Sequence, residues 1–116
     1  TPLMQACCIG DISVVNELLA QGVEIDARNG DGNTAIWLAC FSDSIEIVER
    51  LVRSGANINN QNRDGVTALI YAASAGKASV VHSLLTLGAN KTLTSQDGFT
   101  ALDLAATPHV VRLLRN

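Results

Sequence analysis

Residues 67–90 read TALIYAASAGKASVVHSLLTLGAN, and this stretch decides the fold because its pattern returns every 33 residues. Four threonines keep that spacing: Thr1, Thr34, Thr67 and Thr100. An Asp-Gly pair recurs at 31–32, 64–65 and 97–98, and another glycine at 22, 55 and 88. Self-similarity at this period is typical of a stacked array, in which one unit cannot bury its apolar face alone. The sequence therefore predicts an all-α solenoid of stacked helix-turn-helix units.

We expect one domain over residues 1–116, with units at 1–33, 34–66, 67–99 and 100–116. Each opening threonine suits the N-cap of a short helix. In the first unit Leu3, Ala6 and Cys7 form one apolar stripe on that helix. Gly10 can end it in a left-handed conformation, and Asp43 takes this place in the second unit.

A second helix is predicted in each unit from apolar residues spaced three and four apart. In the first unit these residues are Ile12, Val14, Val15, Leu18 and Leu19. The glycines at 22, 55 and 88 end the helix, and each Asp-Gly pair forms the turn of a projecting, β-hairpin-like loop. The last unit is shorter, and Pro108 is placed to begin its second helix.

The composition narrows the function class. Apolar residues make up 47% of the chain and charged residues 16%, which favours a packed array over a disordered segment. A formal net charge of −3 gives no electrostatic reason to expect nucleic acid or an anionic membrane as partner. No apolar run approaches the roughly 18 residues of a membrane-spanning helix, and no signal peptide opens the chain. Because residue 1 already lies inside a unit, we expect a monomeric fragment of a longer protein.

The cysteines point to a reducing compartment. Three cysteines do not fit a secreted disulfide scaffold, which carries a denser and even set. Cys7 and Cys40 occupy equivalent positions, where the later units have Ala73 and Ala106. A position that accepts Cys or Ala is a small buried one, so these thiols are interpreted as structural. We expect an intracellular, cytoplasmic location.

The recurring residues resemble the ankyrin repeat family over essentially the whole chain. The segments TPLMQACCIGDISVVNELLAQGVEID and TALIYAASAGKASVVHSLLTLGAN carry the resemblance most clearly. It implies L-shaped units, helix pairs stacked side by side, and binding of a protein partner through the inner, concave helices and the loop tips. The family often has Pro-Leu-His after the threonine, whereas this chain reads PLM, AIW, ALI and ALD. We expect apolar contacts to replace the missing histidine between units.

The binding surface is predicted from the aromatic residues. At about 100° per residue, Trp37, Phe41 and Tyr71 lie off the core stripe of the first helices. Trp37 and Phe41 are four apart and meet on one helix face, where they either anchor a partner or fill the space between neighbouring helices. Our hypothesis is a partner that inserts an apolar side chain between the second and third units. The candidate partner-binding residues are Trp37, Phe41, Arg63, Asp64, Val66, Tyr71, Gln96 and Phe99.

Catalysis is not expected from these residues. His82 and His109 are the only histidines, and the other units have Asn16 and Glu49 at the position of His82. No metal-binding or phosphate-binding motif is present, so we expect no enzyme activity, no metal and no cofactor. Two alternatives stay open: a regulatory or targeting segment of a larger enzyme, and a structural element that self-assembles through the open first unit. By resemblance, Asn59 also matches a loop position open to asparaginyl hydroxylation.

Overall fold

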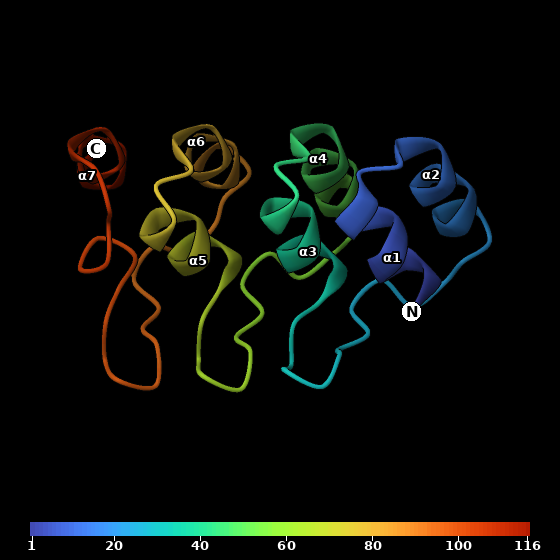
Figure 1. Cartoon of the computed structure of the whole chain (residues 1–116), viewed down its shortest axis with the longest axis horizontal. Helices are drawn as coiled ribbons and strands as arrows, with labels where there is room; N and C mark the ends of the chain where they lie inside the picture. Colours follow the sequence, from blue (N-terminus) through green and yellow to red (C-terminus); the bar gives the residue numbers. More distant parts are fainter.

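The computed structural model describes all 116 residues, and its regular structure is entirely helical. Helices pair as hairpins that lie side by side along the longest axis, and the loops between pairs project to one edge (Figure 1). The molecule measures 39 × 25 × 21 Å, the elongated shape of a stack. The predicted all-α solenoid is confirmed. The helices are α1 (Pro2–Ile9), α2 (Ile12–Ala20), α3 (Ala35–Phe41), α4 (Ile45–Arg53), α5 (Ala68–Ser74), α6 (Ala78–Thr86) and α7 (Pro108–Arg115).

Threonine side chains cap the first helix of two units, α1 and α5. The Thr1 hydroxyl accepts a hydrogen bond from the backbone N–H of Met4 at 3.2 Å, and the Thr67 hydroxyl accepts one from Ile70 at 3.1 Å. Thr34 makes no such bond, and its buried hydroxyl has no partner. The expected N-caps at Thr1 and Thr67 are therefore confirmed, and Thr34 occupies the N-cap position of α3 without the side-chain hydrogen bond. The start of α3 is instead stabilised by the burial of the apolar face of the helix.

The chain reverses after each first helix through a residue with positive φ. Gly10 has φ 85° and Gly76 has φ 71°, as the sequence predicts. Asp43 stands at the same place in the second unit with φ 59°, and it is the one residue other than glycine with positive φ. Aspartate adopts this conformation more readily than most residues because its short polar side chain forms local hydrogen bonds. The helical hairpin therefore survives without a glycine.

The core is a continuous ribbon between the two rows of helices. Its 23 buried residues form one cluster that extends from Leu3 in α1 to Leu114 in α7. The stripe of Leu3, Ala6 and Cys7 is buried as expected, and Cys40 is buried at the equivalent place. Because each unit supplies only part of this ribbon, the stability of every helix depends on the neighbouring units.

Val14 departs from the predicted core. Its equivalents Ile47 and Val80 are 1% and 2% exposed, whereas Val14 is 37% exposed. This side of a second helix packs against the preceding unit, since α4 packs on α2 and α6 on α4. Within residues 1–116, no unit lies on that side of α2. The spacing of Val14 therefore matches that of buried residues in the internal helices, but the prediction that Val14 itself is buried is wrong.

The fourth unit also departs from the expectation of two helices. Residues 101–104 form consecutive turns instead of a first helix, although Thr100 and Asp103 exchange the two hydrogen bonds of a capping box. Pro108 begins α7 as predicted. The pyrrolidine ring excludes the α conformation for the preceding Thr107, whose φ is −135° and ψ is 156°. Too few residues then separate Thr100 from Pro108 for a helix and a reversal.

The loops form a ladder along one edge of the stack. Within each loop a backbone N–H bonds the carbonyl four residues on, as in Asn62 to Val66 at 3.0 Å. Between loops, the N–H of Arg63 donates to the carbonyl of Asp31 at 3.0 Å, and that of Gln96 donates to Asp64 at 2.7 Å. The expected hairpin-like loops are therefore present, and they are joined to one another.

Polar contacts, not only apolar ones, connect neighbouring units where the family histidine is absent. The Ser42 hydroxyl donates to the carbonyl of Cys7 in the preceding unit at 2.7 Å and lies 2.8 Å from the Ser44 hydroxyl. Lys77 makes the corresponding contacts one unit later. The expected apolar contacts are present, since Met4 and Ile70 are buried at the position of the missing histidine. The hydrogen bonds add to them, because helix-terminal carbonyls left without partners inside the stack need donors.

Candidate partner-binding surface

Three of the four aromatic rings gather at the junction of α3 and α5. The Trp37 and Phe41 rings stack with centroids 6.0 Å apart and an interplanar angle of 9°. The Tyr71 ring, from the next unit, lies 4.5 Å from Trp37 and 6.3 Å from Phe41. These separations fall in the range of favourable aromatic pairing. We call Trp37, Phe41 and Tyr71 the aromatic cluster.

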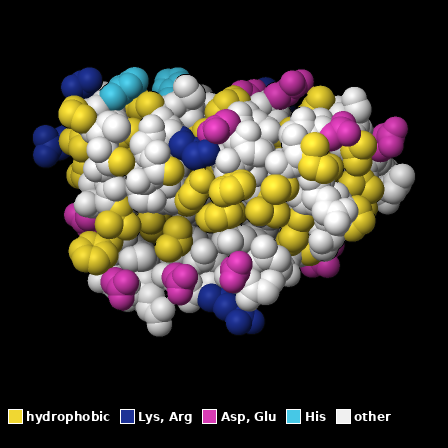
Figure 2. All heavy atoms as spheres, in the orientation of Figure 1, with side chains coloured by type: hydrophobic (Ala, Val, Ile, Leu, Met, Phe, Trp, Pro, Cys, Tyr) yellow, Lys and Arg dark blue, Asp and Glu magenta, His cyan; other side chains and the backbone are white.

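The cluster is part core and part surface. Phe41 is 52% exposed, whereas Trp37 and Tyr71 are half-buried. The indole Nε1 of Trp37 is covered and has no hydrogen-bond partner. Trp37 therefore fills the space between α3 and α5, which was one of its two expected roles, and at the same time supports Phe41 from below. Figure 2 shows the hydrophobic surface that gathers over α3 and towards α5.

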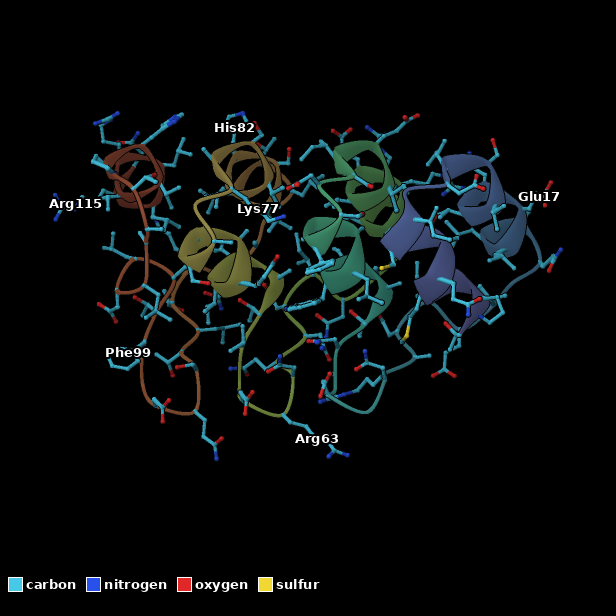
Figure 3. The ribbon with its side chains drawn as sticks, in the orientation of Figure 1. Glu17, Arg63, Lys77, His82, Phe99 and Arg115 are labelled. Atoms are coloured by element: carbon cyan, nitrogen blue, oxygen red, sulfur yellow. The ribbon has the colours of Figure 1, made fainter.

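Lys77 closes one side of the cluster. From the start of α6 it reaches towards α3 (Figure 3), and its Nζ donates to the Phe41 carbonyl at 3.0 Å and to the Cys40 carbonyl at 3.4 Å. The same amine lies 5.9 Å from the Phe41 ring centroid and 5.6 Å from that of Tyr71. These distances allow cation–π attraction.

The charge on Lys77 is held in place. Its Nζ forms an ion pair with the Asp43 carboxylate at 2.8 Å, and the lysine side chain is only 19% exposed. Burial acts to lower the pKa of the amine, but the hydrogen bond to Asp43 and the proximity of Tyr71 raise it by more. The net pKa lies above the ordinary lysine value, so the amine is protonated at every physiological pH. The cluster therefore has a permanent ion pair, Lys77 with Asp43, at its edge.

Sequence reasoning missed Lys77. The equivalent residues are Asp11 and Ser44, and Asp11 serves as an N-cap by accepting a hydrogen bond from Val14. A lysine cannot accept a hydrogen bond from the helix N-terminus, and α6 has no side-chain cap. This mismatch between residue type and position was the available signal, because a cation at a helix start is unfavourable unless it has other partners.

The remaining candidates lie on the loop ladder. Arg63, Asp64 and Gln96 are exposed, and Figure 3 shows Arg63 pointing away from the body of the molecule. Val66 is half-buried. Phe99 is 47% exposed, in the loop before the last unit. The eight candidates thus form the aromatic cluster at mid-stack, a polar rim, and one separate ring.

Little else in the chain offers chemistry. No three His, Cys, Asp or Glu side chains lie together as metal ligands would. Burial raises the pKa of the Cys7 and Cys40 thiols to about 12, so both remain protonated and unreactive at neutral pH. Cys8 is exposed. No helix is both long and apolar enough to cross a bilayer.

Stacked helix pairs with a joined row of loops define a repeat-protein scaffold. A model of the family described as ankyrin repeats (3 copies) matches residues 3–95 and 56–116, and the chain belongs to this family. Among solved structures, the ankyrin repeat domain of Bcl-3, described as a unique member of the IkappaB protein family, is similar with a TM-score of 0.94 and 30% identity. That match covers 98% of this chain and 50% of the other, so the chain spans half its length. None of the curated proteins compared by sequence matches.

Proposed function

We propose that this chain binds a protein partner through the aromatic cluster, with the loop tips as a polar rim. Ankyrin repeats generally act as protein–protein interaction modules, and this supports the class of function. The single observation that carries the choice of surface is the position of Phe41. Its ring is 52% exposed at mid-stack, at a position where the neighbouring units carry the small residues Cys8 and Ser74. Large aromatic side chains supported from below are typical binding hot spots.

The chemistry of the surface favours one kind of contact. A partner that inserts an apolar side chain against Phe41 and Tyr71 would remove exposed ring surface from water, at about 25 cal/mol per Å² of apolar area. Lys77 and Asp43 neutralise each other at the edge, so they orient the partner more than they attract it. Arg63, Asp64 and Gln96 then provide polar contacts from the loops, where Val66 is half-buried, and Phe99 offers a second apolar contact.

Affinity capture from the native host, followed by binding measurements with the purified partner, tests the proposal. We expect Phe41→Ala with Tyr71→Ala to weaken binding by at least about tenfold, because hot-spot truncations cost about 2 kcal/mol or more. Ile9→Ala is the matched control, since Ile9 is 80% exposed and lies in α1, away from the cluster. If the double variant is folded by circular dichroism and binds as tightly as the control, the cluster is not the site.

The proposal includes the wider setting of the chain. We infer an intracellular, cytoplasmic protein from the three free cysteines, two of which are buried without a disulfide. We also infer that residues 1–116 act as one domain, because a single core cluster joins their helices. Binding, not catalysis, is the activity assigned to it.

A further inference from the structure

The helices that carry the aromatic cluster have no charged residue. The sequences of α1, α3 and α5 contain no Asp, Glu, Lys, Arg or His. On α3 and α5, the residues that are not buried are all neutral: Trp37, Leu38, Phe41, Tyr71 and Ser74. Charged groups can therefore reach a partner on this surface only from its two edges, the loop ladder and the ends of the helical hairpins.

The loop edge carries a regular row of carboxylates. Asp31, Asp64 and Asp97 recur one unit apart at the loop tips, and all three are exposed. None of them forms an ion pair, because the ion pairs of the chain lie in α4 and at the start of α6. Figure 2 shows acidic side chains in a row along this edge, directly beside the hydrophobic surface over α3 and α5. These carboxylates are therefore free to meet a cation from a partner.

The opposite edge also presents mainly a carboxylate. The ion pair there joins Lys77 to Asp43, but the two side chains differ in exposure, 19% for the lysine and 65% for the aspartate. The lysine amine is directed inward, to the carbonyls of Cys40 and Phe41. A partner on the aromatic cluster thus meets the negative member of this pair more readily than the positive one.

Two arginines belong to the loop edge as well. The Nη2 of Arg28 donates to the Gln61 carbonyl at 3.2 Å, which holds this side chain on the next loop. Arg63 points away from the body of the molecule (Figure 3). In Figure 2 the acidic side chains of this edge lie between the basic ones and the hydrophobic surface. The charges nearest to the aromatic cluster are therefore negative on both edges.

We propose that the partner of the aromatic cluster is a basic segment of a protein, in which lysine or arginine residues flank one large apolar side chain. This inference rests on the proposed function and names the chemistry of its partner. The apolar side chain packs against Phe41 and Tyr71, and the flanking cations face Asp31 and Asp64. Opposite charges around an apolar centre steer the encounter and fix the register of the bound segment. An acidic segment is repelled by the same carboxylates.

The repeat sets the spacing of the cations. Packed helices lie about 8–10 Å apart, so equivalent loop-tip carboxylates are separated by roughly this distance. An extended chain rises about 3.3 Å per residue. Basic residues about three apart therefore match successive carboxylates, and a short synthetic peptide can reproduce this arrangement.

The probe is a fluorescein-labelled peptide with one central leucine and lysine at every third position on either side. We expect it to bind the 116-residue chain saturably in fluorescence polarisation, and to bind more weakly as ionic strength rises, because salt screens exposed charges. The same peptide with glutamate in place of each lysine should not bind. A peptide with alanine in place of the leucine should bind more weakly, because it lacks the apolar anchor.

A charge-matched pair of variants locates the contact. Asp31→Ser with Asp64→Ser removes two loop-tip carboxylates and keeps a residue type that turns accept. We expect this variant to bind the lysine peptide about fivefold more weakly or worse, and to show a smaller salt dependence, since two exposed ion pairs are lost. Glu17→Gln with Glu46→Gln removes the same charge from exposed sites on α2 and α4, and should bind like the unchanged chain. Circular dichroism confirms that each variant is folded.

The outcomes separate this inference from the proposed function. Failure of the unchanged chain to bind the lysine peptide at low salt overturns the inference, and so does equal binding of the glutamate peptide. If Phe41→Ala with Tyr71→Ala loses the lysine peptide while Asp31→Ser with Asp64→Ser binds it like the control, the aromatic site stands and the basic partner is overturned. If the aromatic variant still binds the lysine peptide as tightly as the unchanged chain, both the inference and the proposed site are overturned.

Discussion

The close approach of successive loops can be tested at one pair of glycines. Gly65 and Gly98 sit at equivalent loop tips with φ of 76° and 85°, conformations that disfavour any side chain. They differ in their neighbours. A Cβ on Gly65 would lie 2.7 Å from the backbone nitrogen of Gln96 and 3.0 Å from the carbonyl carbon of Ser95, whereas a Cβ on Gly98 would meet nothing within 4 Å.

The cost of each alanine substitution follows from this geometry. The left-handed conformation costs roughly 1–2 kcal/mol in either variant. Gly65→Ala must also push the next loop away and lose the 2.7 Å hydrogen bond from Gln96 to the Asp64 carbonyl. That loss adds about 0.5–1.5 kcal/mol. We therefore expect Gly65→Ala to destabilise the chain by about 1 kcal/mol more than Gly98→Ala.

Urea unfolding of both variants, followed by circular dichroism, measures this difference. Both variants carry the same cost of a left-handed alanine. The difference between their free energies of unfolding therefore reports the contact between the loops. Equal losses of unfolding free energy for Gly65→Ala and Gly98→Ala would refute the reasoning, because they would mean that the loop ladder contributes no stability. A larger loss for Gly98→Ala would be equally incompatible with it.

Three further predictions concern the stack. Lys77→Met should lower the free energy of unfolding by about 1–3 kcal/mol in urea titrations, because carbonyls in the second unit lose a charged donor. Leu84→Ala, at a fully buried site, should cost roughly 2–5 kcal/mol, and Leu85→Ala, half-buried, clearly less. Burial raises the pKa of the Cys7 and Cys40 thiols from 9.0 to about 12. Their contribution to the free energy of unfolding is therefore complete below pH 9 and is lost between pH 9 and 12. The slope approaches about 1.4 kcal/mol per pH unit for each thiol, and Cys7→Ala with Cys40→Ala should flatten the fall in stability measured by urea titration over this range.

The sequence was sufficient for the architecture because its period records which face of each helix is buried. The positive φ of Asp43 was predictable from the glycines at equivalent positions. The exposure of Val14 was not, because a repeat pattern assumes that every unit has two neighbours. The missing first helix of the last unit depended on how few residues separate Thr100 from Pro108, a local steric limit that apolar spacing does not express.

The candidate site was predictable only in part. Helical geometry placed Trp37, Phe41 and Tyr71 off the core stripe, and the structure brings their rings together. The contact between α3 and α5 depends on how neighbouring units pack, and helical geometry within one unit does not predict it. The partners of Lys77 are 34 to 37 residues away in the chain, so its role at the cluster could not be found within one repeat.

Trp37 gives the most direct test of the central claim, because it is the only tryptophan in the chain and lies within the aromatic cluster. Its fluorescence should be recorded while the captured partner, or a tryptophan-free peptide from it, is titrated into the protein. The account predicts an emission change that saturates with the dissociation constant found by calorimetry, and no such change for Phe41→Ala with Tyr71→Ala. Saturable heat of binding with unchanged Trp37 emission would show that the partner binds elsewhere.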